Sequence, residues 1–489
     1  MKKVRLWALV SVMMAFAIVF TVCNSDEQNT PDIPELPGAD SAPYFVTNNF
    51  AQDSSTAFVV QWHNAKEIEK QTLQIVKEDG DFASARSIIV TGELFDIAGI
   101  AACPNPTGKC SGPVCNGIGN YAARNIFRAE VSGLDPATKY KYRVGAPDFW
   151  SDTFYHLTSG GSNTGFSFTV VADTQDTNFL AMRNTLQAAE TFDSDNRFFL
   201  HAGDVVDYIG LNRREIENYT NVANTFNTQR PIVTTQGNHD TYHNKSGDQY
   251  IFGEATVYNA FTVFPDNGFS KSHAAAHHNR NRSDSYYFYY NRVLIVMLNT
   301  MATQNATGTS EPVHTAQANW LREVLQNDKN NNLSNYRIVV THIPPFAGRG
   351  SSSDSEPWLV SNVRSAYARI CTEFDVDIFF AGHDHVYTRS DPIKIESNTA
   401  LSGIHYGPTA GGTIYSIAGS TGPKLYDFRN LTGTTNVYIS QSYPIRFDRA
   451  GISPGVFVNV KVTDEKMTVT ANRLNANAPL DTYEVTKKR

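Results

Sequence analysis

The sequence predicts an N-terminal all-β sandwich followed by an α/β layered domain. Between residues 44 and 160, short strand-like runs rich in Val, Thr and Tyr are separated by turn signals. This regular spacing is typical of a small β-sandwich. After the glycine-containing stretch 159–163, buried strands alternate with helical segments, which indicates a layered α/β arrangement. We therefore expect a sandwich over 44–160 and a layered domain over 164–489.

The first 23 residues predict export. A basic start, Met1–Arg5, precedes an apolar run from Leu6 to Val22, and Cys23 follows at once. Cys23 is either lipidated, which would attach the protein to a membrane, or lies beside an ordinary cleavage site or an uncleaved anchor. Residues 24–43 are Pro-rich and acidic and predict a disordered linker. The expected location is the periplasm, the cell envelope or the extracellular space.

Composition narrows the class of protein. Hydrophobic residues make up 41% and charged residues 18% of the chain, so it can bury a large core. The net charge is −7, and the sequence pI is about 6.0. These values give no electrostatic reason to expect nucleic-acid binding.

Individual elements follow from the periodicity of apolar residues. In the sandwich we expect strands at 56–63, 73–76, 87–90, 129–131 and 139–144. In the layered domain we expect strands at 166–171, 198–201, 232–235, 286–290, 293–298, 337–340 and 378–381. Helices are expected at 180–191, 213–226, 315–326 and 356–374. A polar insertion spans 241–284, and the strand-rich tail from 410 is expected to join the same domain.

Polar side chains leave the predicted strands at their carboxyl ends. They are Asp173, Asp204, Asn238, His342, His383 and His385. Ligands of open α/β sheets bind outside these strand ends, so the side chains should share one crevice. Oxygen donors mixed with imidazoles suit Fe, Mn or Zn, and such a set fits two ions that share a carboxylate. Taken one at a time, each residue has an ordinary structural interpretation. Because the residues occur together at successive strand ends, they predict a dinuclear transition-metal site.

The motifs resemble those of the calcineurin-like metallophosphoesterase superfamily, in its purple acid phosphatase-like branch. They are Gly203-Asp204, Gly237-Asn238-His239-Asp240, Thr341-His342 and Gly382-His383-Asp384-His385-Val386-Tyr387. The sequence 134–145 resembles the closing part of a fibronectin type III-like module. The resemblance implies a four-layer αββα domain behind that sandwich. It also implies that Asp204 bridges two metals, that Asp173 and His385 hold the first, and that Asn238, His342 and His383 hold the second.

Two positions depart from the family pattern. Purple enzymes carry a metal-bound tyrosine three residues after the bridging aspartate, but here Asp207 stands there and Tyr208 follows it. The basis for expecting tyrosinate ligation and an obligatory ferric ion is therefore missing. Relatives outside the purple branch place a histidine where this chain has Gln175. Gln175 either replaces that ligand through its side-chain oxygen or lies behind the ligands, and Asp207 and Tyr208 are further candidates for either place.

Catalytic and substrate-binding candidates surround the ligands. The resemblance implies that His239 contacts the phosphoryl group or protonates the leaving oxygen, with a purely structural histidine as the alternative. We expect Asp240 to orient His239 rather than to react itself. The insertion is either a lid that meets phosphate or a solvated loop, and Tyr387 and Arg389 either face substrate or are a packed tyrosine and a solvated arginine. The substrate-binding candidates are thus His243, His277, His278, Tyr387 and Arg389.

These features predict an exported phosphatase that hydrolyses phosphate monoesters with a metal-activated water or hydroxide. A phosphodiesterase or nucleotidase would use the same site. The remote alternative is a surface binding protein with a retired catalytic domain, for which a missing ligand would be the signal. All six core ligand positions are filled.

Overall fold

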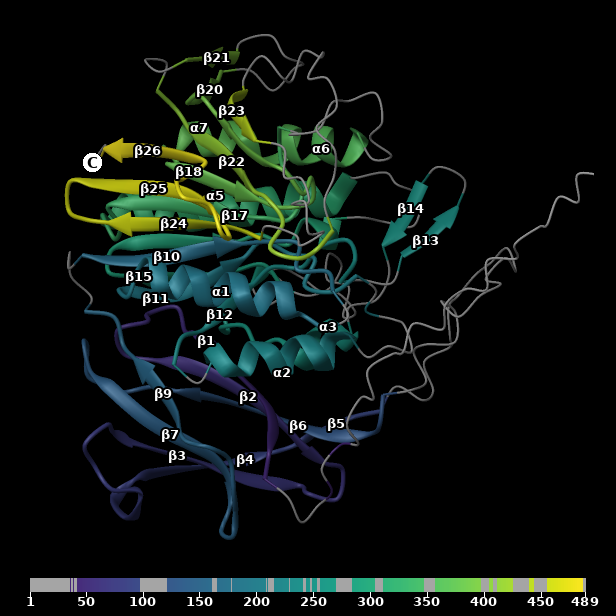
Figure 1. Cartoon of the computed structure of the whole chain (residues 1–489), viewed down its shortest axis with the longest axis vertical. Helices are drawn as coiled ribbons and strands as arrows, with labels where there is room; N and C mark the ends of the chain where they lie inside the picture. The colour runs from purple at the N-terminus through teal and green to yellow at the C-terminus, as the bar shows by residue number, and fades with distance from the viewer. Residues whose placement is uncertain are drawn as a thin grey trace, which may run out of the picture.

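The computed structural model comprises two domains stacked along the long axis of the molecule (Figure 1). It describes residues 36, 38, 42–96, 121–160, 165–176, 178–207, 209, 215–227, 229–240, 243–246, 249–252, 256–269, 284–303, 311–346, 357–396, 404–407, 411–424, 439–443 and 455–486. Predictions for Cys23, Tyr208, His277, His278 and the segment 1–35 lie outside this part of the chain. Within it, no helix is both long and apolar enough to cross a membrane.

The N-terminal domain is an antiparallel β-sandwich, as the sequence predicts. One sheet has the order β1 (Tyr44–Phe50), β2 (Phe58–Ala65), β6 (Arg124–Val131) and β5 (Glu93–Phe95). The other has the order β4 (Arg86–Thr91), β3 (Lys70–Lys77), β7 (Lys139–Ala146) and β8 (Phe149–Trp150), with β9 (Phe154–Leu157) also on β7 and the 3-10 turn η1 at Phe82–Ser84. Alternate side chains fill the space between the sheets, where Trp62 stacks on Phe127 with ring centroids 5.6 Å apart.

The second domain contains two sheets packed face to face. The first has the order β12 (Ile232–Thr234), β11 (Asn196–His201), β10 (Phe166–Val171), β24 (Val456–Val462), β25 (Lys466–Arg473) and β26 (Asp481–Thr486). The second has the order β15 (Tyr286–Tyr290), β16 (Val293–Met297), β17 (Tyr336–Val340), β18 (Ile378–Ala381), β22 (Ile414–Ala418), β19 (Tyr387–Ser390) and β23 (Ile439–Tyr443). The tail thus joins this domain, as expected, and it contributes strands to both sheets.

Helices cover the outer face of each sheet. The helices α1 (Leu180–Phe192), α2 (Glu215–Asn227) and α3 (Thr256–Phe261) share one apolar cluster with the first sheet. The second sheet is covered by α5 (Glu311–Asn331), α6 (Pro357–Val363), a π-helical turn (Arg364–Ala368) and α7 (Arg369–Glu373), with η5 at Thr300–Thr303. A third cluster fills the space between the sheets. The layers therefore run α–β–β–α, which confirms the predicted fold class.

The central strands are parallel, and this parallel pairing sets the position of the site. β10, β11 and β12 pair in parallel, as do β16, β17, β18 and β22. Their residues are buried almost throughout because layers cover both faces, which explains the continuous apolar runs in the sequence. Parallel strands end at a common edge, so the residues that follow them converge.

The helix α2 lies between the layered domain and the sandwich (Figure 1) and packs on β1. Arg124 of β6 forms a fully buried ion pair with Glu217 of α2, at 2.7 Å between Nη2 and Oε1. The guanidinium carbon of Arg124 also lies 5.6 Å from the ring centroid of Phe261 in α3. The hydroxyl of Tyr121 donates to the carbonyl oxygen of Ile209 at 3.0 Å. The two domains are therefore joined by buried polar contacts.

Part of the polar insertion belongs to this interface. The segment 256–264 carries α3, and the carbonyl oxygen of its Ala260 accepts the side-chain amide of Gln61 at 2.6 Å. The backbone of Val263 accepts the side-chain amide of Asn49 at 2.9 Å. For this segment, the expectation of a lid or a solvated loop is wrong, because it packs against the sandwich. Hairpins β13–β14 (His243–Ser246, Gln249–Phe252) and β20–β21 (Ile393–Ile395, Ile404–Tyr406) complete the fold.

Candidate metal centre

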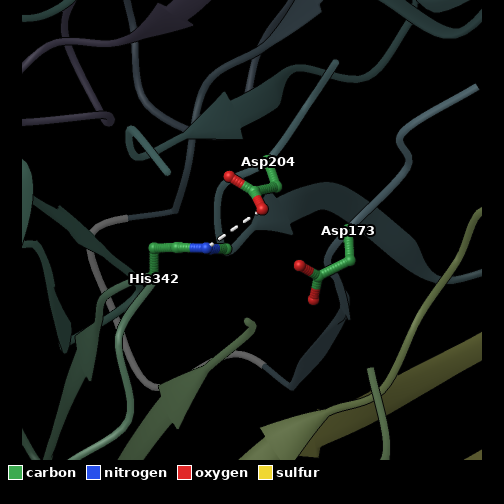
Figure 2. A group of neighbouring side chains, drawn as sticks. All are labelled: Asp173, Asp204 and His342. Atoms are coloured by element: carbon green, nitrogen blue, oxygen red, sulfur yellow. Dashed lines mark ion pairs between the residues drawn. The ribbon is translucent and has the colours of Figure 1, made fainter. Parts of the chain in front are cut away.

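The six predicted ligands converge at the carboxyl ends of the parallel strands. Asp173, Asp204 and Asn238 follow β10, β11 and β12 of the first sheet, and the three histidines follow β17 and β18 of the second. Donor atoms of Asp173, Asp204 and His342 all lie within 4.8 Å of one another, and all three residues are buried (Figure 2). His342 Nε2 is 3.2 Å from Asp204 Oδ2. The two sheets thus meet at one acidic, imidazole-lined point.

The other three predicted ligands border this cluster. Asn238 Oδ1 lies 2.9 Å from His342 Nε2 and 3.1 Å from His383 Nδ1. His385 Nε2 lies 3.4 Å from Asp173 Oδ1. Short contacts thus join Asn238, His342, His383 and Asp204 to one another, and His385 to Asp173. The two groups meet where donor atoms of Asp173, Asp204 and His342 lie within 4.8 Å of one another.

Two imidazoles are held with Nε2 toward the cluster. His342 Nδ1–H donates to the carbonyl oxygen of Ala202 at 2.9 Å, and His385 Nδ1–H donates to that of Lys424 at 2.6 Å. A carbonyl oxygen only accepts, so Nδ1 carries the proton in each ring. Such backbone contacts are the usual way in which proteins orient metal-binding histidines.

Four of the ligands have a left-handed backbone. The φ angles are +52° at Asp173, +54° at Asp204, +73° at His383 and +53° at His385. Such a conformation costs a residue other than glycine on the order of 1–3 kcal/mol. Because it occurs where each strand ends, it turns the side chain toward the common edge. Strain at several residues of one cluster points to a functional site.

Glycines make room for the ligands. A Cβ on Gly237 would lie 2.1 Å from Asp204 Oδ1, so no larger residue fits there. Gly203 has a φ of +86°, and a Cβ there would lie 2.8 Å from His342. The glycines of the sequence motifs are therefore required by close packing around the ligands.

The electrostatics of the cluster favour a cation. Burial raises the pKa of Asp173 well above its usual range, and the nearby charge of Asp204 adds to this effect. Burial also acts to raise the pKa of Asp204, but the charges of His342 and His239 and the hydrogen bonds that they donate together lower that pKa. Burial acts to lower the pKa of His342, but Asp204, Asp173 and the hydrogen bond to the Ala202 carbonyl together raise the pKa to about 9. Two buried carboxylates thus need positive charge beside them.

Gln175 adds a further oxygen beside the cluster. Its side chain is buried, and Nε2 donates to Asp204 Oδ2 at 2.8 Å. Its Oε1 is buried with no hydrogen-bond partner in the part of the chain that the structure describes. A buried oxygen without a donor is costly unless another group binds it. The donor set therefore fits bound metal, with Gln175 facing the same point.

Asp240 and His239 have different partners from those expected. The Asp240 carboxylate accepts the backbone N–H groups of Val205 at 2.9 Å and Gly237 at 2.8 Å. Burial, together with the charge of Asp204, raises its pKa to about 7. His239 Nδ1–H instead donates to the carbonyl oxygen of Asp207 at 2.6 Å. The expectation that Asp240 orients His239 is corrected: Asp240 fixes the two ligand loops, and the Asp207 carbonyl orients the imidazole.

Three partly exposed residues form a rim beside the buried ligands: His239, Asp207 and Lys424. Lys424 Nζ lies 3.0 Å from Asp207 Oδ1, which is 3.6 Å from His239 Nδ1. Lys424 could not be predicted from the sequence, because it lies in the strand-rich tail and belongs to none of the motifs. Its neighbours Gly422 and Pro423 indicate only a turn.

Tyr387 and Arg389 contact the C-terminal strand. Tyr387 is fully buried and its hydroxyl donates to Asp481 Oδ2 at 2.9 Å. Arg389 Nε donates to the same oxygen at 2.6 Å. Tyr387 is thus the packed tyrosine of the two alternatives. Arg389 is ion-paired and mostly buried, which corrects both of its alternatives. The backbone of His243 lies in β13.

Comparison with known proteins identifies both domains. Residues 166–387 match the family model of the calcineurin-like phosphoesterases, and residues 43–158 match that of the purple acid phosphatase N-terminal domain. The chain carries a calcineurin-like phosphoesterase domain behind a purple acid phosphatase N-terminal domain. The phosphoesterase match begins at β10 and ends just after the ligand histidines, so it encloses all six predicted ligands.

Individual relatives agree with this assignment. Purple acid phosphatase 21 of Arabidopsis thaliana is 27% identical over 273 residues, which are 56% of this chain and 55% of that protein. The Fe(3+)-Zn(2+) purple acid phosphatase 12 of the same plant is 22% identical, over 58% of this chain and 56% of its own length. The match thus spans about half the length of these curated relatives. The structure of purple acid phosphatase PPD1 from yellow lupin (Lupinus luteus) seeds has the same two-domain fold as this chain, with a TM-score of 0.65 and 16% identity. The similarity covers 91% of this chain and 74% of that one.

Proposed function

We propose that the protein is an exported phosphatase that hydrolyses phosphate monoesters at a dinuclear transition-metal centre. The observation that carries the proposal is the convergence of the six donor side chains at the common edge of two sheets. The name of one relative includes iron and zinc, and the donor set suits Fe, Mn or Zn. Export rests on the N-terminal sequence, where Cys23 is the candidate for lipidation.

We assign the ligands as the family pattern implies. Asp204 would bridge both ions, Asp173 and His385 would hold the first, and Asn238, His342 and His383 would hold the second. Bound transition-metal ions would supply a strong nucleophile from water and neutralise charge on the phosphoryl oxygens. Asp204 stabilises the protonated form of His342 in the metal-free protein. Metal binding must therefore displace this proton from the imidazole.

His239 is the residue that we assign to the leaving group. The Asp207 carbonyl holds the proton of its Nδ1, so Nε2 is the atom left for exchange with substrate. Its backbone N–H donates to Asp204 Oδ1 at 2.9 Å, which ties the imidazole to the bridging carboxylate. Asp240 secures both loops from behind through backbone N–H groups. The imidazole is thereby placed to protonate the leaving oxygen of an ester.

The proposal is tested on full-length chain expressed in a bacterium. We expect the protein in the envelope fraction or the medium, with close to two transition-metal ions per chain by elemental analysis. We also expect it to hydrolyse p-nitrophenyl phosphate faster than the bis-ester. Retention in the cytoplasm would reject export, and one ion or none after reconstitution would reject the dinuclear site. Preference for the bis-ester would favour the phosphodiesterase alternative.

Gln175 is expected to hold the first metal through Oε1, because that buried oxygen has no hydrogen-bond partner among the described residues. Replacing it with leucine should weaken binding of one ion by about 10- to 100-fold. Equilibrium dialysis against a graded chelator measures this loss independently of turnover. Gln175→His is the matched control, since histidine can also bind a metal ion, and it should retain both ions. Equal retention of two ions by the leucine variant would place Gln175 behind the ligands.

A further inference from the structure

The ammonium of Lys424 lies at the rim of the metal centre. The Lys424 carbonyl accepts Nδ1–H of His385 at 2.6 Å, so its backbone is fixed against a metal ligand. Its Nζ contacts Asp207 Oδ1 at 3.0 Å. The predicted ligands are buried, whereas the side chains of His239, Asp207 and Lys424 are 15%, 29% and 30% exposed. Among the described residues, these three side chains therefore offer partly exposed groups beside the buried ligands.

Asp207 makes the rim unfavourable for an anion unless its charge is balanced. Its carboxylate lies 3.6 Å from Nδ1 of His239, whose backbone N–H donates to Asp204, so it adds a negative charge near that of the buried cluster. Carboxylate and phosphate repel each other strongly at short range. Lys424 balances that charge through the ion pair. An ammonium carries three N–H donors, so it can contact Asp207 and a phosphate oxygen together.

We propose that Lys424 binds a non-reacting phosphoryl oxygen of the substrate and selects phosphate monoesters over diesters. The inference rests on the proposed function and names the substrate class of that site. A monoester dianion presents an additional charged oxygen to the ammonium, whereas in a diester that oxygen carries a second organic group. A hydrogen bond between charged partners is stronger than one between neutral groups, so the contact discriminates between them.

The test compares Lys424→Gln and Lys424→Arg in metal-loaded protein. We expect Lys424→Gln to lower kcat/KM for p-nitrophenyl phosphate, and the affinity for inorganic phosphate, by about 10- to 100-fold. Hydrolysis of the bis-ester should change by less than about threefold. Lys424→Arg keeps the charge and should retain most of the phosphate affinity. Lys461→Gln, at an exposed position of β24, is the matched control for loss of a lysine. Equal losses on both esters would overturn the proposal.

A double variant separates direct contact from charge balance. If Lys424 only neutralised Asp207, then Asp207→Asn in the Lys424→Gln background would restore phosphate affinity. Direct contact predicts that the affinity stays low, and restoration would overturn the proposal. If the wild-type protein hydrolyses neither ester, the proposed function fails separately. Calorimetric titration with inorganic phosphate then tests the proposed contact of Lys424 with phosphate independently of catalysis. An unchanged phosphate affinity in Lys424→Gln would overturn the proposed contact. A tenfold loss of affinity would support it.

Discussion

Asp204→Asn is expected to lower kcat/KM for p-nitrophenyl phosphate at least about 1,000-fold, which corresponds to about 4 kcal/mol of activation free energy. Asparagine has the same shape but removes the charge that is assigned to bridge both metals. It also turns one acceptor into a donor. Asp204 Oδ1 accepts the backbone N–H of His239, and Oδ2 accepts the side-chain amide of Gln175. One of these donors would then face an NH₂ group.

Metal analysis shows whether the loss has this cause. The asparagine variant should retain fewer than two ions per chain under conditions that fully load the wild-type protein. Asp195→Asn is the matched control, because Asp195 is exposed and its nearest cation, Arg197, lies 3.9 Å away. Turnover near that of the wild type in Asp204→Asn would show that the centre is elsewhere.

Arg124→Met is expected to destabilise the protein by about 3–5 kcal/mol. The substitution leaves the buried carboxylate of Glu217 without its ion-pair partner in the sandwich. It also removes the guanidinium from its contacts with the rings of Phe45 and Phe261. Urea unfolding monitored by fluorescence measures the change in the free energy of unfolding.

Two further variants define the cause. Arg322 and Glu373 form an exposed ion pair, so Arg322→Met should cost no more than about 1 kcal/mol. Combining Arg124→Met with Glu217→Leu removes both charges and should recover most of the stability. A loss as small in Arg124→Met as in Arg322→Met would mean that the buried pair does not hold the domains together.

The convergence of the six predicted ligands could be predicted from the sequence because their positions depend on local patterns. Each ligand follows a short apolar strand or a glycine-containing turn, and both are visible in the chain. Parallel pairing then brings these side chains together, because it places the carboxyl ends of the strands at one edge of the sheet. The alternation of strands and helices likewise predicted a layered α/β domain, and the family resemblance implied the order of its four layers.

Contacts between distant segments could not be predicted in this way. Lys424 reaches the site only because the chain returns there after β22, and no motif surrounds it. Arg389 was expected to be solvated or to face substrate, but β26 supplies Asp481 as its partner from 92 positions away. Asp240 was expected to orient His239, yet its carboxylate accepts backbone N–H groups of Val205 and Gly237 from two loops. Side-chain direction in such turns depends on backbone angles that composition does not reveal.

The left-handed backbone lowers the stability of the protein at four residues that the proposed activity requires, which are Asp173, Asp204, His383 and His385. Glycine would adopt these angles without strain, but it offers no donor atom. Aspartate and histidine therefore stand where the backbone alone favours glycine. Laboratory evolution for heat resistance, without selection for turnover, should erode these positions early. Thermostable variants need to gain their stability elsewhere, and the surfaces away from the strand ends are the places to seek it.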